Sequence, residues 1–448
     1  MSLEDKLYPL LAVYERMPRP LKRTLGAAYR RLPQKVRLGA AYGDFRKLIE
    51  ESQSWSKVQM TAWQVEQLRT VLHEAVNYCP FYRKRSARVD SFDDLAAWPT
   101  LEKKDLQEHR EQLKSTRFSA SQRLYITTGG STGEPVGFYL QRGVSRPKEQ
   151  AFLEAMWRRA GYTDGARMAV IRGHVTTSAA HGRIVSYDAT RDWLMLSSFH
   201  LTADRLPEYL EAIENFKPDM LHVYPSAALQ LAEFLEQANQ SWRIPLRAVL
   251  CGSEQLTLPQ KRVVERVFGC RVYRWYGHSE RVVLAGEAQD SDLFHFWPQY
   301  GFVEFGPPEE DGLREVIGTS FHNLAMPLIR YRTGDYVRVN DSGAVSEIAG
   351  RAQEFLLSAT GRRISLTAFN MHDAIFDNLY AVQFYQETPG EAEFRYIPAP
   401  HFNRTRLEAI EKRMRQKLGD DFRIELRAVK EVEKTARGKQ RWLVSKLH

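Results

Sequence analysis

Seven consecutive residues, 127–133, comprise three glycines and four hydroxyl-bearing side chains, and Glu-Pro follows them. Strand-like apolar runs flank this segment at 124–126 and 136–140. Glycine adopts φ > 0 and lets the backbone approach a ligand closely, while successive N–H groups and neighbouring hydroxyls bind anions. The segment therefore suits a polyphosphate. It is not a Walker A motif, because no Gly-Lys-Ser/Thr follows, and a simple hairpin turn is the alternative.

Strand and helix patterns alternate along the chain after this segment. Buried-strand runs lie at 168–171, 220–224 and 248–250, and helical patterns lie at 207–216, 227–238 and 259–268. The alternation predicts a mostly parallel sheet with covering helices, and ligands of such sheets bind beyond the carboxyl ends of the strands. Gly252-Ser253-Glu254 follows one of these strands, where the chain must turn sharply.

The patterns predict three regions. Residues 1–120 form a helical extension that is part of the large domain, with a helix at 64–76 because apolar residues recur there at helical spacing. Residues 121–350 form the core of the large domain, which becomes more β-rich at 294–340. Residues 351–448 form a small α+β domain, with a helix at 405–418. The predicted fold class is therefore α/β, with mostly parallel sheets and helices in the large domain.

The bulk composition limits the class and location of the protein. The 448 residues are 43% hydrophobic, which is enough for two or more domains with their own cores. No apolar run reaches the length of a membrane span, and the N-terminus lacks a signal-peptide core. The three cysteines are isolated, which argues against a disulfide framework and fits a reducing, cytoplasmic location.

The net charge of +9 is distributed unevenly. Residues 1–47 contain eleven Lys/Arg and four Asp/Glu, and residues 401–448 contain fourteen and seven. The basic N-terminal stretch is interleaved with Leu, Tyr and Ala, which fits peripheral association with an anionic surface such as the inner membrane. The alternative, which we favour from the sequence, is a solvated helical face that packs on the main domain. No motif supports a nucleic-acid partner.

Seven segments, in order along the chain, resemble motifs of the adenylate-forming superfamily, and the phenylacetate–CoA ligase and CapK-like branch fits best. The segments are 127–135, 224–226, 252–254, 276–280, 327–335, 350–351 and 438–439. The resemblance implies a large adenylate-forming domain and a small, mobile C-terminal lid. It also implies that a carboxylic acid attacks the α-phosphate of ATP, giving an acyl-adenylate and pyrophosphate. The acyl group then passes to a thiol, for which coenzyme A is expected.

The resemblance assigns catalytic roles to three residues. Lys439 would bridge the substrate carboxylate and the α-phosphate, Glu280 would bind Mg²⁺, and Thr132 would act in the phosphate loop. Mg²⁺ prefers a carboxylate with phosphate oxygens and water, and a cation between two reacting anions gives a direct electrostatic gain. The alternative for Glu280 is a surface salt bridge with Arg274 or Arg281. The alternative for Lys439 is that it is one more solvated lysine in a basic tail.

The implied nucleotide site is larger than this catalytic set. Asp335 would accept hydrogen bonds from the ribose hydroxyls, Arg351 would contact ribose or phosphate at the hinge, and Tyr276 would stack on adenine. His278 is assigned only a lining role. The full set is Thr127, Thr128, Gly129, Gly130, Ser131, Thr132, Gly133, Gly252, Ser253, Glu254, Tyr276, Gly277, His278, Ser279, Asp335 and Arg351.

The chain departs from the family pattern at several positions. Val136 stands where many relatives have a lysine after the phosphate loop. The loop therefore has one cation fewer, and more of the neutralisation of phosphate charge is left to the metal. Gln-Glu at 353–354 stands where relatives have the hinge residue. Some relatives carry a Cys/His zinc site, but this chain has no cysteine in that region, only Glu287, Gln289 and His295, so no zinc is predicted.

The implied acyl pocket leaves the substrate open. Its lining residues are His174, Tyr224, Pro225, Ser226 and Trp275. Aromatic and apolar members suit an aryl or short acyl acid, although core packing also explains them, whereas Arg172, His174 and His181 suit a polar acid such as a uronic acid. An amine acceptor in capsule or surface polysaccharide biosynthesis is the alternative to coenzyme A. A non-catalytic scaffold ranks last, because the catalytic residues are all present. Relatives are often dimers, which leaves a homodimer open.

Overall fold

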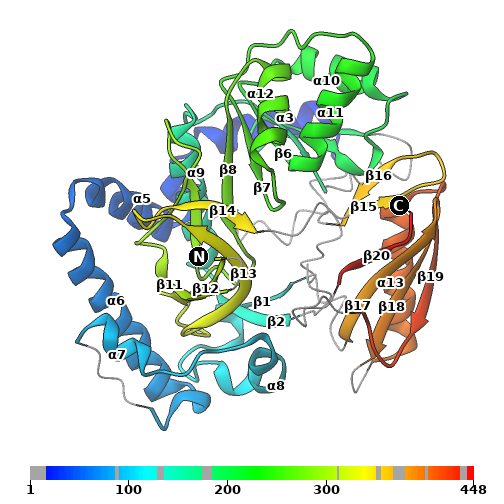
Figure 1. Cartoon of the computed structure of the whole chain (residues 1–448). Coiled ribbons are helices and arrows are strands. Elements are labelled where there is room, and N and C mark those ends of the chain that lie inside the picture. Colours follow the sequence, from blue (N-terminus) through cyan, green and yellow to red (C-terminus); the bar gives the residue numbers. More distant parts are fainter. Residues whose placement is uncertain are drawn as a thin grey trace. The chain divides into compact units, whose positions relative to one another are not determined.

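The computed structural model describes residues 17–85, 90–128, 136–173, 184–309, 312–349, 355–366, 379–398, 402–433 and 441–447 (Figure 1). The chain divides into two compact units. The first comprises Met1–Ile126, Gly137–Thr163 and Tyr273–Gly350, and the second comprises Thr127–Val136, Asp164–Val272 and Arg351–His448. The predicted limits at residues 120 and 350 stay predictions.

The N-terminal part of the first unit is helical. The apolar spacing of the predicted helix at 64–76 falls within a longer helix, α6, whose apolar residues are buried along one face. Ser56 caps the N-terminus of this helix, because its side chain accepts a hydrogen bond from the Gln59 backbone N–H. The described α-helices of this unit are α3 (Arg19–Arg31), α4 (Gln34–Leu38), α5 (Ala40–Glu51), α6 (Lys57–Tyr78), α7 (Phe92–Ala96), α8 (Lys103–Leu113) and α9 (Ser145–Arg159).

The strands that follow in this unit pair antiparallel, in the order β11-β12-β13-β14-β10-β9-β8. Short connections join most of them, and such connections suit antiparallel neighbours. Two further strands, β1 (Arg123–Thr128) and β2 (Val136–Gln141), form a small separate sheet and flank the predicted phosphate loop. The remaining bounds are β8 (Val272–Gly277), β9 (Leu284–Glu287), β10 (Phe294–Phe296), β11 (Gly301–Pro308), β12 (Arg314–Ser320), β13 (Tyr331–Val339) and β14 (Val345–Ala349).

The second unit contains the predicted parallel strands. Strands β5, β3, β6 and β7 are parallel neighbours, and β4 adds an antiparallel edge. Figure 1 shows α10, α11 and α12 gathered beside β6 and β7. The mixed α/β fold class is confirmed, with parallel pairing concentrated in these four strands. The bounds are β3 (Met168–Arg172), β4 (Val185–Asp188), β5 (Trp193–Ser197), α10 (Leu206–Phe216), β6 (Met220–Val223), α11 (Pro225–Gln237), β7 (Ala248–Gly252) and α12 (Leu258–Phe268).

The C-terminal segment of the second unit is a four-stranded sheet, in the order β19-β18-β17-β20, with one long helix. Its core residues join those of the parallel sheet in a single apolar cluster. The Arg362 guanidinium links the two parts, because it donates to the carbonyl of Phe199 and pairs with Asp421. The bounds are β15 (Phe355–Leu357), β16 (Arg363–Ser365), β17 (Leu379–Thr388), β18 (Glu391–Pro398), α13 (Arg404–Leu418), β19 (Arg423–Ala428) and β20 (Leu443–Ser445).

Within the described ranges, no helix has both the length and the apolarity that a bilayer crossing requires. All three cysteines are described and are free thiols.

Candidate active site

Two tyrosines bring the two predicted carboxylates of the first unit together. Tyr276, in β8, donates its hydroxyl hydrogen to Asp335 Oδ2 at 2.9 Å. Tyr331, at the start of β13, donates to Glu280 Oε1, also at 2.9 Å. The pairing is therefore crossed, because the tyrosine of the run YGHSE holds the aspartate of YRTGD and the tyrosine of YRTGD holds the glutamate of YGHSE. Burial, followed by the charge of Asp335, raises the pKa of Tyr276 well above its ordinary value, which keeps this hydroxyl a donor.

Glu280 is a buried but ionised carboxylate. Its residue is only 6% exposed, and its Oε2 lies 3.4 Å from His278 Nδ1. Burial alone would raise the pKa of this carboxyl, but His278 and the positive charge of Lys103 outweigh burial and lower the pKa to about 2. The surface salt bridge considered from the sequence is wrong. Arg274 instead pairs with Glu287, and Arg281 lies 3.8 Å from Glu149.

His278 lies beside this carboxylate, and its ring nitrogens are not used in hydrogen bonds among the described residues. The 3.4 Å separation from Glu280 is an ion-pair distance rather than a well-formed hydrogen bond. Among the described residues, neither ring nitrogen of His278 has a hydrogen-bond partner, although both atoms are shielded from solvent. A buried polar atom of this kind requires an explanation, and a ligand that hydrogen-bonds to this ring would supply one.

The depressed pKa predicts how the stability of the first unit depends on pH. A carboxyl whose pKa falls from 4.5 to about 2 on folding stabilises the fold above pH 4.5, and this contribution is lost as the pH falls toward 2. We therefore expect wild type to exceed Glu280→Gln in denaturant midpoint at pH 6 and the difference to shrink between about pH 4.5 and 2. Equilibrium unfolding in urea at a series of pH values measures this. A difference that stays constant with pH would contradict the assignment.

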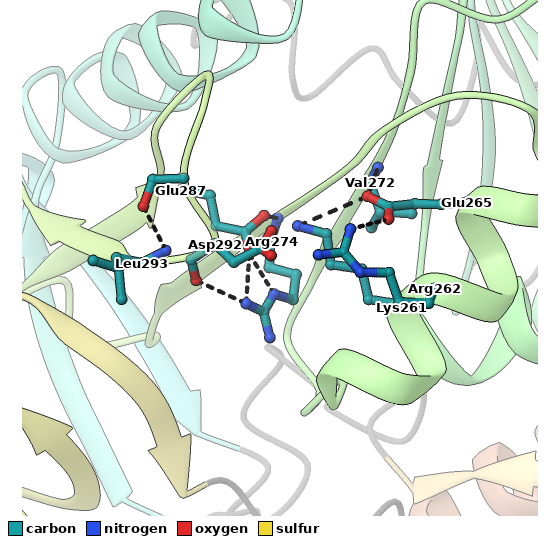
Figure 2. A network of polar contacts seen from close by, with 9 residues as sticks. Lys261, Arg262, Glu265, Val272, Arg274, Glu287, Asp292 and Leu293 are labelled. Carbon is teal, nitrogen blue, oxygen red and sulfur yellow. Dashed lines mark hydrogen bonds and ion pairs between the residues drawn. The ribbon is translucent and has the colours of Figure 1, made fainter.

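A buried ion pair lies on the neighbouring strands, where the sequence analysis considered zinc (Figure 2). Arg274 Nε donates to Glu287 Oε1 at 2.6 Å, and the Arg274 backbone N–H donates to Oε2 at 3.0 Å. Arg274 Nη2 donates to the carbonyl of Asp292, and the guanidinium lies 4.8 Å from the centre of the Phe294 ring. Figure 2 also shows Glu265 of α12 accepting from the Val272 N–H. Glu287 therefore has a structural role, and the absence of zinc stays a prediction.

Removing the charge of only one partner of this ion pair should strongly lower the free energy of unfolding. The Arg274 and Glu287 side chains are 9% and 0% exposed, so Glu287→Gln leaves an uncompensated buried guanidinium. We expect the free energy of unfolding to fall by about 3–5 kcal/mol. The double variant Arg274→Met/Glu287→Met should recover most of the loss, because it removes both charges together. Urea unfolding of Arg274→Met, Glu287→Met and the double variant, beside Glu287→Gln, tests this, and additive losses in the two methionine variants would contradict it.

In the second unit, polar side chains gather at the carboxyl ends of β3, β6 and β7. Arg172 Nη2 donates to Ser253 Oγ at 2.6 Å, and Arg172 Nη1 lies 2.6 Å from His222 Nε2. The same guanidinium lies 4.5 Å from the centre of the Tyr224 ring. From the sequence, Arg172 was connected only with a polar acid, and His222 carried no signal. The parallel register, with Ile171 opposite Val223, is what brings these side chains to one edge.

The turns after β6 and β7 are also joined. Glu254 Oε2 accepts a hydrogen bond from the Ser226 backbone N–H at 2.8 Å, in the first turn of α11. A carboxylate at this position satisfies a backbone donor that the helix leaves unpaired. Ser253 adopts φ +75, and Arg281, which follows Glu280, adopts φ +55. Left-handed backbone at non-glycine residues is strained and concentrates at functional sites. The predicted residues 224–226 and 252–254 therefore form one connected corner.

The remaining predicted site residues divide into two groups. Thr127 is buried at the end of β1, Val136 is buried at the start of β2, and Trp275 packs against the apolar cluster around Phe152 and Trp297. Trp275 therefore packs in a hydrophobic core, which was the alternative to a place in the acyl pocket. Thr128 is described only as a strand residue. Residues 129–135, His174, Val175, Thr176, His181, Arg351, 353–354 and Lys439 lie outside the described residues.

Among solved structures, a 2-hydroxyisobutyryl-CoA ligase in complex with 2-HIB-AMP and CoA in the thioesterification state aligns with a TM-score of 0.55 and 18% identity. The alignment covers 88% of this chain and 91% of that chain. The same ligase in the postadenylation state gives a TM-score of 0.53 and 16% identity. The fold is therefore that of the adenylate-forming ligases.

Sequence matches specify the branch. Residues 356–446 match the family model of the CapK C-terminal domain. A phenylacetate-coenzyme A ligase from Pseudomonas putida is 27% identical over 339 residues, which cover 70% of this chain and 75% of the relative. Protein CapK from Staphylococcus aureus is 23% identical over 271 residues, covering 58% and 59%. These similarities agree with the branch of the adenylate-forming superfamily that the sequence motifs resemble, that of the phenylacetate–CoA ligases and CapK.

Proposed function

We propose that this protein activates a carboxylic acid with ATP to form an acyl-adenylate. The observation that carries the proposal is the crossed pair of tyrosine–carboxylate hydrogen bonds, which links Glu280, in the turn after β8, and Asp335, within β13, to the two strands. A buried carboxylate held ionised, beside a carboxylate oriented by a tyrosine, suits a nucleotide with its metal. Sequence relatives whose names include coenzyme A ligase support the same activity.

The proposed chemistry has two steps. A substrate carboxylate oxygen attacks the α-phosphorus of ATP, the bond between the α-phosphorus and the bridging oxygen breaks, and pyrophosphate leaves. The acceptor then attacks the carbonyl carbon of the adenylate, loses its proton, and displaces AMP. Negative charge at the reacting phosphorus must be met by positioned donors and cations. In this proposal the loop at 127–133 holds the terminal phosphates and Lys439 lies between the reacting anions.

The described residues fit a single-carboxylate magnesium site. No group of three or more His, Cys, Asp or Glu side chains that could hold a metal occurs within the described ranges. Mg²⁺ commonly uses one or two protein carboxylates and takes its other ligands from phosphate and water. Glu280 meets this need, because it stays ionised at neutral pH and Tyr331 fixes one of its oxygens. Bound Mg²⁺ would neutralise phosphate charge, and Asp335 would orient the ribose.

We propose coenzyme A as the acceptor, because named coenzyme A ligases occur among the sequence relatives. The match of residues 356–446 to the CapK C-terminal domain favours a second candidate, transfer to an amine in surface polysaccharide assembly. The two differ in one measurable respect. Only the first requires coenzyme A for sustained release of AMP.

ATP–pyrophosphate exchange with a panel of carboxylic acids tests the proposed function. We expect exchange that depends on one class of acid and on Mg²⁺. Each active acid is then incubated with coenzyme A, with simple amines or with neither, and AMP release is followed. No exchange with any acid, together with no measurable ATP binding, would overturn the proposed function. Exchange with amine-dependent AMP release would identify the second candidate.

Arg172 provides a test of substrate class. A uronic acid carries hydroxyl groups that an aryl acid lacks. We propose that Arg172, at the carboxyl end of β3, donates hydrogen bonds to such groups of a polar acid. Removal of a charged hydrogen-bond donor should then raise KM for the polar acid by about 10–100-fold in Arg172→Leu, with little change for an aryl acid. Arg247→Leu is the matched control, because Arg247 is half-exposed and pairs with Asp219 in the same unit. An equal effect on both acids would contradict recognition of polar groups by Arg172.

A further inference from the structure

Exposed apolar side chains are concentrated near the start of the described chain. Six large apolar residues are exposed among the described residues, and four of them lie between positions 21 and 36. Leu21, Leu25, Leu32 and Val36 are 48%, 44%, 38% and 49% exposed. Single exposed leucines are ordinary, but a contiguous group marks an interaction surface. We call these four residues the apolar stripe.

Two residues of the apolar stripe lie on α3, one directly follows this helix, and one lies on α4. Leu21 and Leu25 are four residues apart, which places them on the same side of α3, whereas Leu32 is the C-cap residue and has an extended backbone. Gly26, on another side of α3, is buried. An amphipathic helix normally packs by its apolar face. Here that face is in solvent, which differs from the packed helix that we favoured from the sequence.

The charge around the apolar stripe has a single sign. Residues 17–43 contain seven Lys/Arg and no Asp/Glu. Lys22, Arg23, Arg30 and Arg31 lie on α3, and α4 contributes Lys35 and Arg37 on either side of Val36. A short helix with apolar residues on one face and Lys/Arg on the other is the pattern of helices that lie in the membrane interface. Anionic headgroups complement this charge.

We propose that α3 and α4 bind peripherally to an anionic membrane surface. The apolar stripe enters the boundary between headgroups and acyl chains, and the flanking cations contact lipid phosphates. At 13 residues, α3 is far too short to cross a bilayer. A nucleic-acid surface would also attract the Lys and Arg side chains, but it has no apolar layer in which exposed leucines could be buried. A lipid surface accounts for both the basic and the apolar residues. This proposal does not depend on the proposed catalytic activity.

Vesicle flotation with the full-length protein tests the proposal. One vesicle population contains only phosphatidylcholine, and the other also contains phosphatidylglycerol. We expect wild type to float with the anionic vesicles, weakly or not at all with the neutral ones, and to dissociate as salt is raised. Leu21→Gln/Leu25→Gln should lower partitioning at least about tenfold, because it removes apolar area and retains both the charge and a helix-forming side chain.

Two controls make the result specific. Val58→Gln/Leu258→Gln changes the other two exposed apolar residues, which are 78% and 43% exposed, and should bind vesicles like wild type. Circular dichroism of each variant checks that the fold is retained. Wild type that ignores both vesicle types overturns the proposal, as does equal loss in the two double variants. Failure to bind vesicles combined with Arg30- and Arg31-dependent binding of duplex DNA would assign this face to nucleic acid instead.

Discussion

Lys439→Ala should lower the rate of ATP–pyrophosphate exchange by about a thousandfold, the largest effect expected of any substitution in this chain. In the proposed first step a carboxylate approaches a negatively charged phosphate, and one ammonium group between them offsets the repulsion of both. Loss of that cation leaves the repulsion unscreened in a water-poor site. Exchange should be measured with the acid that the panel identifies, at saturating ATP and Mg²⁺.

The second step should survive this substitution. Lys439 is proposed to act on adenylate formation, so Lys439→Ala supplied with synthetic acyl-adenylate and the acceptor should still release AMP at a rate close to wild type. Lys446→Ala is the matched control, because Lys446 is an exposed lysine in the same basic tail and should exchange normally. Unchanged exchange in Lys439→Ala, or equal loss in Lys446→Ala, would move the catalytic role to another residue.

Glu280→Gln should produce the second-largest loss. The variant keeps the acceptor for the Tyr331 hydroxyl but removes the charge that would hold Mg²⁺ against the phosphates. We expect kcat/KM for exchange to fall by about a hundredfold at low Mg²⁺, and the loss to diminish as Mg²⁺ is raised. A titration of exchange rate against Mg²⁺ measures this directly. A loss that Mg²⁺ does not change would contradict a role in metal binding.

Glu149→Gln separates this effect from general damage to the first unit. Glu149 is a partly buried carboxylate of α9 that accepts from the Tyr300 hydroxyl and lies near Arg281. It therefore resembles Glu280 in its environment but has no proposed part in the reaction. Near-normal exchange and Mg²⁺ dependence in Glu149→Gln, beside the loss in Glu280→Gln, would attribute the effect to the carboxylate of the site.

Local pattern predicted much of the second unit. Apolar strand runs and helical spacing predicted β3, β6, β7 and the helices α10, α11 and α12 with bounds within about two residues, which is the accuracy expected of helix ends. The reason is that burial on a sheet or helix face imposes a short period on the sequence. The same logic placed residues 252–254 at a strand end. It could not predict that Arg172 and His222 meet there, because strand order and register decide that contact.

The sequence by itself determined which residues are candidates for nucleotide binding, because residue type and spacing within a motif are local properties. Only the tertiary structure decided which tyrosine donates a hydrogen bond to which carboxylate. Tyr276 and Asp335 are 59 positions apart, and Tyr331 and Glu280 are 51 apart. Strands β8 and β13 are not neighbours in the sheet, so the packing of the whole unit rather than any local pattern creates the crossed bonds. The apolar stripe shows the same division. Periodicity reveals that Leu21 and Leu25 share a face, but whether that face is covered depends on how the rest of the chain packs.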